Sequence, residues 1–304
     1  MQLFSVPLSE HLDVSEYFLN LIQEQWERRG QDKDIRPALR EKIQLCSTGK
    51  VDGKILVQGQ EPVGIFWMEK NTQTYGSIVF FASHSIYQQA LVDSAVQSGY
   101  FNDRLLELVD VEDTDAYRKC LEQAGLNKNS RKRMCCWLDK AKRFDEEEHD
   151  YTFSPFLKEH VAQTAQISFD AHKVSKDYEL YPDLTNLEKR TVLEERVYNG
   201  LYGQLVQPAS MVVWHQGELI ASCMMIEVSC WGFEKVPWIF DIVVTPKKIG
   251  QGVGRILLKK ALNACIDEDY PAVGLAVTLS NKYAIRLYHR LGFQDVDIFY
   301  EFIR

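Results

Sequence analysis

The sequence predicts an α/β protein made of two similar units. Its 304 residues are too many for one average domain and suit two. Helical and strand-like patterns follow the same order in both halves, and an acidic run at positions 145–150 separates them. We therefore expect one domain at residues 1–140, an acidic linker at 141–152 and a second domain at 153–304.

Hydrophobic periodicity defines the elements of the first half. Apolar residues at helical spacing predict helices over residues 14–29, 35–46 and 87–98. Strand patterns cover residues 54–58 and 63–69, which a hairpin turn sequence joins, and then 77–82 and 105–111. Thr114 can cap a further helix that ends near Gly125, and a short strand at 133–138 follows.

The second half repeats this order. Helices are expected at residues 159–173 and 187–200, followed by hairpin strands at 211–214 and 219–228. A strand at 238–244, a helix at 253–266, a strand at 273–277 and a helix at 281–291 come next, before a last strand at 293–303. The repeated order predicts two copies of one α/β unit.

Composition restricts the class of protein. Hydrophobic residues make up 45% and charged residues 26%, as in ordinary globular proteins, and the net charge of −8 disfavours binding to nucleic-acid phosphates. The seven cysteines are odd in number and form no C-x-x-C pair, so we expect free thiols and no metal site. We also expect no signal peptide and no membrane span, and hence a cytoplasmic protein.

A glycine-rich segment follows the strand at 238–244. Gly250, Gly252 and Gly254 occupy alternate positions immediately before a helical pattern begins. Glycines allow positive φ, and successive free N–H groups at a helix N-terminus form a concave site for an anion such as a diphosphate. Basic side chains that could add charge there are Lys247, Lys248 and Arg255.

The glycine-rich segment does not match two other phosphate-binding motifs. A Walker loop requires Lys and then Ser or Thr after its last glycine, whereas Arg255 and Ile256 follow Gly254. A dinucleotide fingerprint requires G-x-G-x-x-G, but the spacing here is G-x-G-x-G. The glycines alone fit a plain strand-to-helix connection equally well.

Two motifs together carry a resemblance to a known family. The segment from Val244-Thr245-Pro246 to Gly252-Val253-Gly254 resembles the acetyl-CoA loop of the GNAT family of N-acetyltransferases. The later segment from Asn281 through Tyr288 to Gly292-Phe293 resembles the second signature of that family. The resemblance covers residues 155–304, and it reaches the first half only through element order.

The resemblance implies two GNAT-like domains in tandem, each with a mixed, mostly antiparallel sheet flanked by helices. It also implies that the N-terminal copy is degenerate. No glycine follows the strand at 77–82, and Leu121 occupies the place that corresponds to Tyr288. Such a copy would shape the acceptor side of the site.

The resemblance also implies acetyl-CoA as co-substrate. Tyr288 would protonate the departing thiolate, and backbone N–H near Val244 would polarise the carbonyl. The implied cofactor-binding residues are Ile242, Val243, Val244, Ile249, Gly250, Gln251, Gly252, Val253, Gly254, Arg255 and Asn281.

The general base is not assigned by the sequence. The family often places Glu or His on the fourth strand, but Trp238 and Phe240 occupy the inward places, and Asp241 points to the other face of a regular strand. Glu227 and Glu234 are weak candidates that could act through water, and exposed strand-end acids explain them as well.

The expected function is transfer of an acetyl group to a primary amine by direct attack in a ternary complex. The acceptor is an amine-bearing small molecule or a protein lysine or N-terminus, and no membrane partner is expected. An acidic, aromatic stretch could line the acceptor side: Asp177, Tyr178, Glu179, Tyr181 and Asp183. The alternative is a non-enzymatic acetyl-CoA sensor. The tandem layout also resembles some secreted effectors of the family, which would act in a host cytosol.

Overall fold

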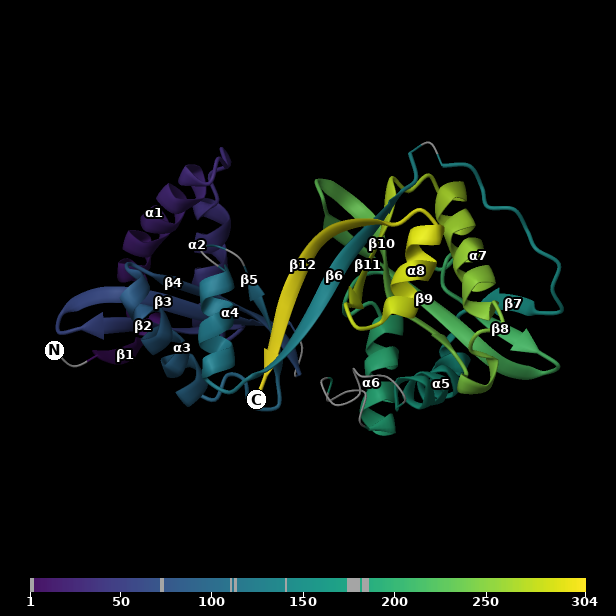
Figure 1. Cartoon of the computed structure of the whole chain (residues 1–304), viewed down its shortest axis with the longest axis horizontal. Helices are drawn as coiled ribbons and strands as arrows, with labels where there is room; N and C mark the ends of the chain where they lie inside the picture. The colour runs from purple at the N-terminus through teal and green to yellow at the C-terminus, as the bar shows by residue number, and fades with distance from the viewer. Residues whose placement is uncertain are drawn as a thin grey trace. The chain divides into compact units, whose positions relative to one another are not determined.

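The chain forms two compact units, one of Met1–Ser130 with Phe299–Arg304 and one of Arg131–Ile298. Figure 1 shows the computed structural model, which describes residues 3–71, 74–109, 111, 114–139, 141–173, 181 and 186–304. Both units are mixed α/β structures with mostly antiparallel sheets, so the predicted fold class is confirmed. The division at residues 1–140, 141–152 and 153–304 remains a proposal beside these compact units.

The first unit contains a sheet in which only β4 and β5 are parallel neighbours. Its strands, in spatial order, are β1 (Leu3–Pro7), β2 (Val51–Gln58), β3 (Glu61–Lys70), β4 (Tyr75–Ala82), β5 (Leu105–Val109) and the end of β12 (Gln294–Ile303). One face packs on α1 (Leu12–Arg28) and α2 (Arg36–Gln44), with Phe18 and Ile22 fully buried. The other face packs on α3 (Gln88–Gln97) and α4 (Thr114–Gln123).

The second unit repeats this element order. Its strands are β7 (Thr152–Pro155), β8 (Met211–His215), β9 (Glu218–Cys230), β10 (Phe233–Val244), β11 (Ala272–Thr278) and β6 (Asn127–Trp137). Here β10 and β11 are the parallel pair. Its helices are α5 (Val161–Lys173), α6 (Leu187–Tyr198), α7 (Val253–Asp267) and α8 (Lys282–Arg290).

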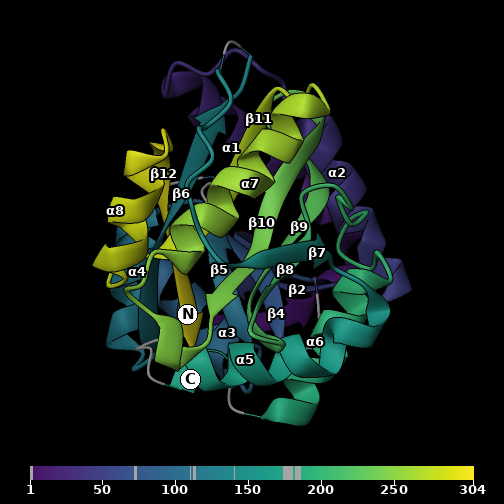
Figure 2. The same cartoon turned by 90° about the vertical axis from the view of Figure 1, so that its right-hand side faces the viewer.

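Two hydrophobic cores cover the two faces of the second sheet. Helices α5 and α6 pack against Val212, Met224 and Ile226. Helices α7 and α8 pack against the opposite face, with Leu257 and Leu258 fully buried; Figure 2 shows α7 lying across the sheet. Alternate residues of β9 therefore enter different cores, because side chains alternate across a strand. The faces are called the α5–α6 face and the α7–α8 face below.

Each sheet includes a strand from the other half of the sequence. Strand β6 pairs antiparallel with β11, from Ala272↔Trp137 to Thr278↔Arg131. The end of β12 pairs with β5 through Glu301↔Glu107 and Phe302↔Leu106. Consequently each sheet contains a pairing between residues that lie more than a hundred positions apart in the sequence.

Two strands were not predicted. Strands β1 and β7 have five and four residues, and each ends in proline. Both lie at sheet edges and no residue of either is buried. A short, half-exposed edge strand lacks the apolar run or the long alternation on which prediction depends.

Candidate active site

The ladder between β10 and β11 is short, and this opens a split in the sheet. Among the residues that the structure describes, its pairs are Trp238↔Gly274 and Ile239↔Leu275. Strand β10 nevertheless continues to Val244, where its other edge still pairs with β9 at Ala221. Backbone groups of residues 240–244 that face β11 are therefore available to an extended ligand, which could bind as an added strand does.

A β-bulge marks the closed end of this split. The register runs from Ile239↔Met225 directly to Asp241↔Met224, so Phe240 is the extra residue. A bulge reverses the alternation of side chains beyond it. Asp241 consequently lies on the α5–α6 face, the face against which Trp238 and Phe240 pack. The expectation that Asp241 points to the opposite face is wrong, because it assumed a regular strand.

The glycine-rich segment forms a turn with free backbone donors. After the 3-10 turn Pro246–Lys248, Gly250 and Gly252 adopt φ of 82° and 85°, and α7 begins at Val253. Within the described part of the chain, the N–H groups of Gly250, Gly252, Val253 and Gly254 have no hydrogen-bond partner. These donors and the positive end of the helix suit a diphosphate.

The loop also lies close to β10. A Cβ on Gly254 would lie 3.4 Å from Cγ2 of Val244, so the start of the helix lies within van der Waals range of the strand end. Ile249 is 53% exposed, as suits a position whose backbone rather than side chain would face a phosphate. The loop and the free edge of β10 thus form one continuous line of backbone donors and acceptors.

An acidic side chain already occupies the basic start of α7. Glu147 forms ion pairs with Arg255 and with Lys259, whose Nζ lies 2.6 Å from Oε1. The hydrogen bond from Lys259 and the charge of Arg255 lower the pKa of Glu147. Nearby, the Phe144 N–H donates to Oδ1 of Asn263 at 2.8 Å. The expected linker at 141–152 therefore contacts α7 through Glu147 and Phe144.

Tyr288 lies in the core of the α7–α8 face. It is 8% exposed, and its ring centroid is 5.6 Å from that of Phe293. No described residue forms a hydrogen bond with its hydroxyl. Burial, and then the charges of Cys223 and Asp241, raise the pKa of Tyr288. The phenol therefore stays protonated at neutral pH and can donate its proton.

Asn281 has a structural partner. It is the N-cap of α8, and its side-chain oxygen accepts the N–H of Ala284 at 3.1 Å. This bond explains why an amide residue begins the helix. Its contact with a cofactor remains a prediction.

The two acids considered as bases lie toward the other end of β10. Glu227 pairs with Pro237 in the ladder, and its carboxylate accepts the Tyr270 hydroxyl at 2.6 Å. Glu234 is exposed, and its backbone oxygen accepts the Ser229 hydroxyl. Pro237 precedes Asp241 by four residues, about 13 Å along a strand. The structure does not bring these acids together with Tyr288 and the bulge.

Sequence reasoning missed a buried polar cluster on the α5–α6 face. Arg190 of α6 forms ion pairs with Asp241 and, at 3.0 Å, with Glu194. Ser168 of α5 donates to Asp241 at 3.0 Å, and His172 Nε2 lies 3.7 Å from Asp241 Oδ1. The only signals in the sequence were an acid within an apolar strand and an Arg–Glu pair at helical spacing.

The charges of this cluster are mutually compensated. Burial alone would raise the pKa of Asp241, but the Arg190 guanidinium and the contact with His172 outweigh burial and hold that pKa below its ordinary range. Burial raises the pKa of Glu194 despite the same guanidinium. Asp241 therefore stays ionised and is too weak a base to take a proton from an amine.

The structure describes one residue, Tyr181, of the acidic and aromatic stretch that was expected to line the acceptor side. Asp177, Tyr178, Glu179 and Asp183 lie outside the described residues. The ring of Tyr181 lies 5.7 Å from the guanidinium carbon of Arg131. Among the described residues, no group of three potential ligands could hold a metal ion, and no helix is long and apolar enough to cross a bilayer.

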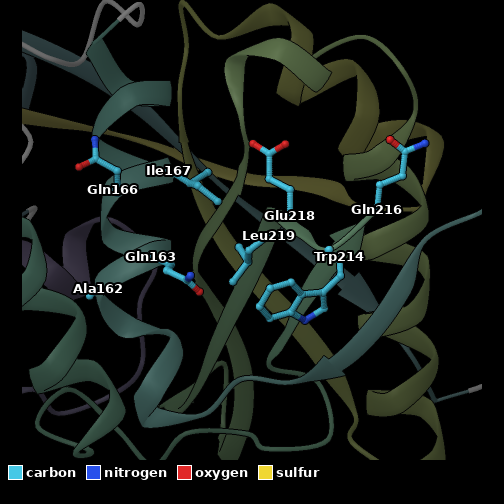
Figure 3. A pocket seen from close by; sticks show the side chains of 9 residues that line it. Ala162, Gln163, Gln166, Ile167, Trp214, Gln216, Glu218 and Leu219 are labelled. Atoms are coloured by element: carbon cyan, nitrogen blue, oxygen red, sulfur yellow. The ribbon is translucent and has the colours of Figure 1, made fainter.

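A separate pocket of about 580 Å³ opens between α5 and the β8–β9 hairpin (Figure 3). The predicted site residues do not line it. Its lining residues are Ala162, Gln163, Gln166, Ile167, Trp214, Gln216, Gly217, Glu218 and Leu219.

This geometry agrees with the comparisons with known proteins. Residues 177–293 match the acetyltransferase (GNAT) family, so the second unit contains a GNAT acetyltransferase domain. A thialysine N-epsilon-acetyltransferase of Bos taurus is 41% identical over 56 residues, which are 18% of this chain and 33% of that protein. The chain thus spans about one third of the length of this relative.

Solved structures resemble the chain over its full length. A GCN5-related N-acetyltransferase from Sphaerobacter thermophilus has a TM-score of 0.59 at 14% identity, covering 94% of this chain and 90% of that one. A tandem GNAT protein from the clavulanic acid biosynthesis pathway has a TM-score of 0.53 at 12% identity, covering 99% and 98%. These likenesses confirm the predicted fold, whereas the degenerate state of the N-terminal copy remains a proposal.

We predict that Arg190→Met strongly destabilises the second unit. The change leaves two buried carboxylates, Asp241 and Glu194, without their shared cation, which costs about 3–5 kcal/mol of unfolding free energy. Urea unfolding followed by tryptophan fluorescence measures it. In the control Arg143→Met, which removes an exposed pair with Asp267, the midpoint should not move. Equal midpoints for the two variants would contradict the prediction.

We also predict that Glu147→Gln tightens binding of acetyl-CoA. Removing the carboxylate frees Arg255 and Lys259 for phosphates, so affinity should rise about two- to fivefold at low salt, less at high salt. Calorimetry measures the dissociation constant. Glu148→Gln removes the same charge from an exposed neighbour and is the matched control. Equal affinities of these two variants would show that the Glu147 contacts do not compete with the ligand.

Proposed function

We propose that the second unit transfers the acetyl group of acetyl-CoA to a primary amine. The observation that carries the proposal is the split beside residues 240–244, which leads directly to free N–H groups at the start of α7. This combination suits a ligand with an extended amide-containing arm and a diphosphate. The GNAT match at residues 177–293 supports the same conclusion.

In this proposal the backbone of Ile242, Val243 and Val244 pairs with the pantetheine arm. Backbone N–H groups of residues 249–255 hold the diphosphate, and Arg255 adds charge once Glu147 releases it. The amine nitrogen attacks the thioester carbon directly, so the C–N bond forms as the C–S bond breaks. Tyr288 gives its proton to the departing sulfur.

A small amino-acid-like amine is one acceptor class that a relative supports, because the Bos taurus protein is named for the ε-amine of thialysine. A protein lysine or N-terminus is the other class. The seven cysteines, all free thiols, suit the reducing cytosol in which we propose that the enzyme acts.

For the first unit we propose a copy without a cofactor. After β4, the chain enters α3 through the 3-10 turn Ser85–Tyr87, and no glycine lies in this connection. The ladder between β4 and β5 runs over five pairs, from Tyr75↔Leu105 to Val79↔Val109.

Gly252→Asp tests the loop. A carboxylate at this positive-φ position would repel a diphosphate, so acetyl-CoA affinity should fall roughly 100-fold or more by calorimetry. Gly217→Asp is a matched control, since Gly217 has φ of 81° in a hairpin turn with open space around it. Unchanged affinity in Gly252→Asp would remove the loop from the site.

Tyr288→Phe tests the proton donor. Turnover, measured as thiol release over a panel of amines, should fall roughly 100-fold while acetyl-CoA affinity stays the same. Equal turnover would exclude Tyr288 as the acid. If the unaltered protein binds acetyl-CoA and releases no thiol with any amine, the alternative of a non-enzymatic sensor is favoured; the position of Glu227 and Glu234 away from the bulge motivates it.

A further inference from the structure

The closed end of the split fixes where an acyl group can lie. An arm that pairs with β10 from the loop side can advance along the residues from Val244 back to the bulge. At Ile239 the edge of β10 is already paired with β11, so the arm can go no further. The acyl end of such an arm would therefore lie beside Phe240 and Asp241.

A histidine from another element reaches this point. His172, near the C-terminal end of α5, has Nε2 3.7 Å from Oδ1 of Asp241. Its side chain is 25% exposed, whereas that of Asp241 is 11% exposed. The imidazole thus joins a buried carboxylate to a more accessible position beside the bulge.

The acid and this histidine lie on opposite faces of the sheet. Tyr288 belongs to the core of the α7–α8 face, and His172 contacts Asp241 on the α5–α6 face. An acyl group on the edge of β10 would have a proton donor on one face and an imidazole on the other. Such an arrangement suits direct transfer, in which the amine loses a proton and the sulfur gains one.

We propose that His172 is the general base of the reaction and that Asp241 positions it. The proposal rests on the proposed function and goes beyond it, because Glu227 and Glu234 were the only bases that the sequence suggested. A lysine-like amine has a pKa near 10.4 and is mostly protonated at neutral pH, so it needs a proton acceptor. The ammonium first gives one proton to His172, which releases it to solvent. The neutral amine then attacks, His172 accepts a second proton from the nitrogen as the C–N bond forms, and Tyr288 protonates the sulfur as the C–S bond breaks. His172 then releases its proton to solvent, and Tyr288 regains one.

The other charged groups of the cluster cannot take this role. Arg190 is a permanent cation, Glu194 is fully buried beside it, and Asp241 is neutralised by it. Lys173, the next residue of α5, directs its ammonium to the ring of Phe169 at 4.5 Å. On α8, Tyr288 serves as the acid. Among the described residues of the cluster, His172 is the accessible side chain that can both accept and release a proton.

Steady-state rates against pH test the proposal, with the enzyme, acetyl-CoA and the best amine of the panel. In the unaltered enzyme, kcat/KM for the amine should rise with pH through a limb in the range of imidazole titration. His172→Ala should lower kcat/KM roughly 100- to 1000-fold and remove this limb, while calorimetric affinity for acetyl-CoA stays the same. Added imidazole should restore part of the rate in His172→Ala. A merely structural role for His172 would not produce this rescue.

Two further variants sharpen the test. His215→Gln removes another histidine of the same unit that is paired with an aspartate, Asp150 at 2.8 Å, and it should leave the pH limb in place. Asp241→Asn removes the carboxylate beside the imidazole, so kcat should fall while KM for the amine and affinity for acetyl-CoA stay the same. An unchanged kcat in Asp241→Asn would overturn the positioning role.

The outcomes distinguish failure of the base assignment from failure of the proposed function. If the unaltered enzyme turns over and His172→Ala keeps its rate within about twofold, the base assignment is overturned and the proposed function survives. If the unaltered protein binds acetyl-CoA and acetylates no amine, both are overturned. Loss of acetyl-CoA binding in His172→Ala would instead indicate a structural defect and would also count against the assignment. His172→Gln, which keeps more of the side-chain volume, provides a second check.

Discussion

The site depends on the interruption of one strand pairing. Strands β10 and β11 are hydrogen bonded at Ile239 and Leu275 and then cease to pair, while β10 remains fixed to β9 on its other side. A parallel ladder that continued would satisfy its own backbone groups and leave nothing for a ligand. The bulge at Phe240, in the pairing with β9, lies where the pairing with β11 ends, and it turns Asp241 toward α5 and α6. One inserted residue thus selects which side chains lie at the end of the free edge.

Electrostatic compensation supports this arrangement on both faces. Arg190 holds two carboxylates in a largely buried position, and one of them, Asp241, contacts His172. Removing one partner of such a cluster is costly because it leaves charge without solvent. Beyond the C-terminal end of β10, Glu147 forms ion pairs with Arg255 and Lys259 beside the free N–H groups. These surface pairs are weak and exchangeable, as a site for a charged ligand requires.

The two units show how one element order can support different connections. Both place a parallel strand pair beside a helix that follows the first strand of the pair. In the second unit, residues 250–254 supply positive φ and a helix start that is close to β10. In the first unit, a short 3-10 turn makes the same connection without glycine. The difference in backbone chemistry, and not in topology, distinguishes the proposed functional unit.

The sequence by itself determined the elements and the backbone chemistry of the loop. Apolar periodicity located all the long helices and strands, and the spacing of Gly250, Gly252 and Gly254 identified the turn, because both signals are local. Tertiary structure alone decided the rest. The pairing of β6 with β11, the Glu147 contacts and the bulge depend on partners far away in the sequence. The direction in which Asp241 points, and hence its contact with His172, followed from one extra residue that periodicity does not reveal.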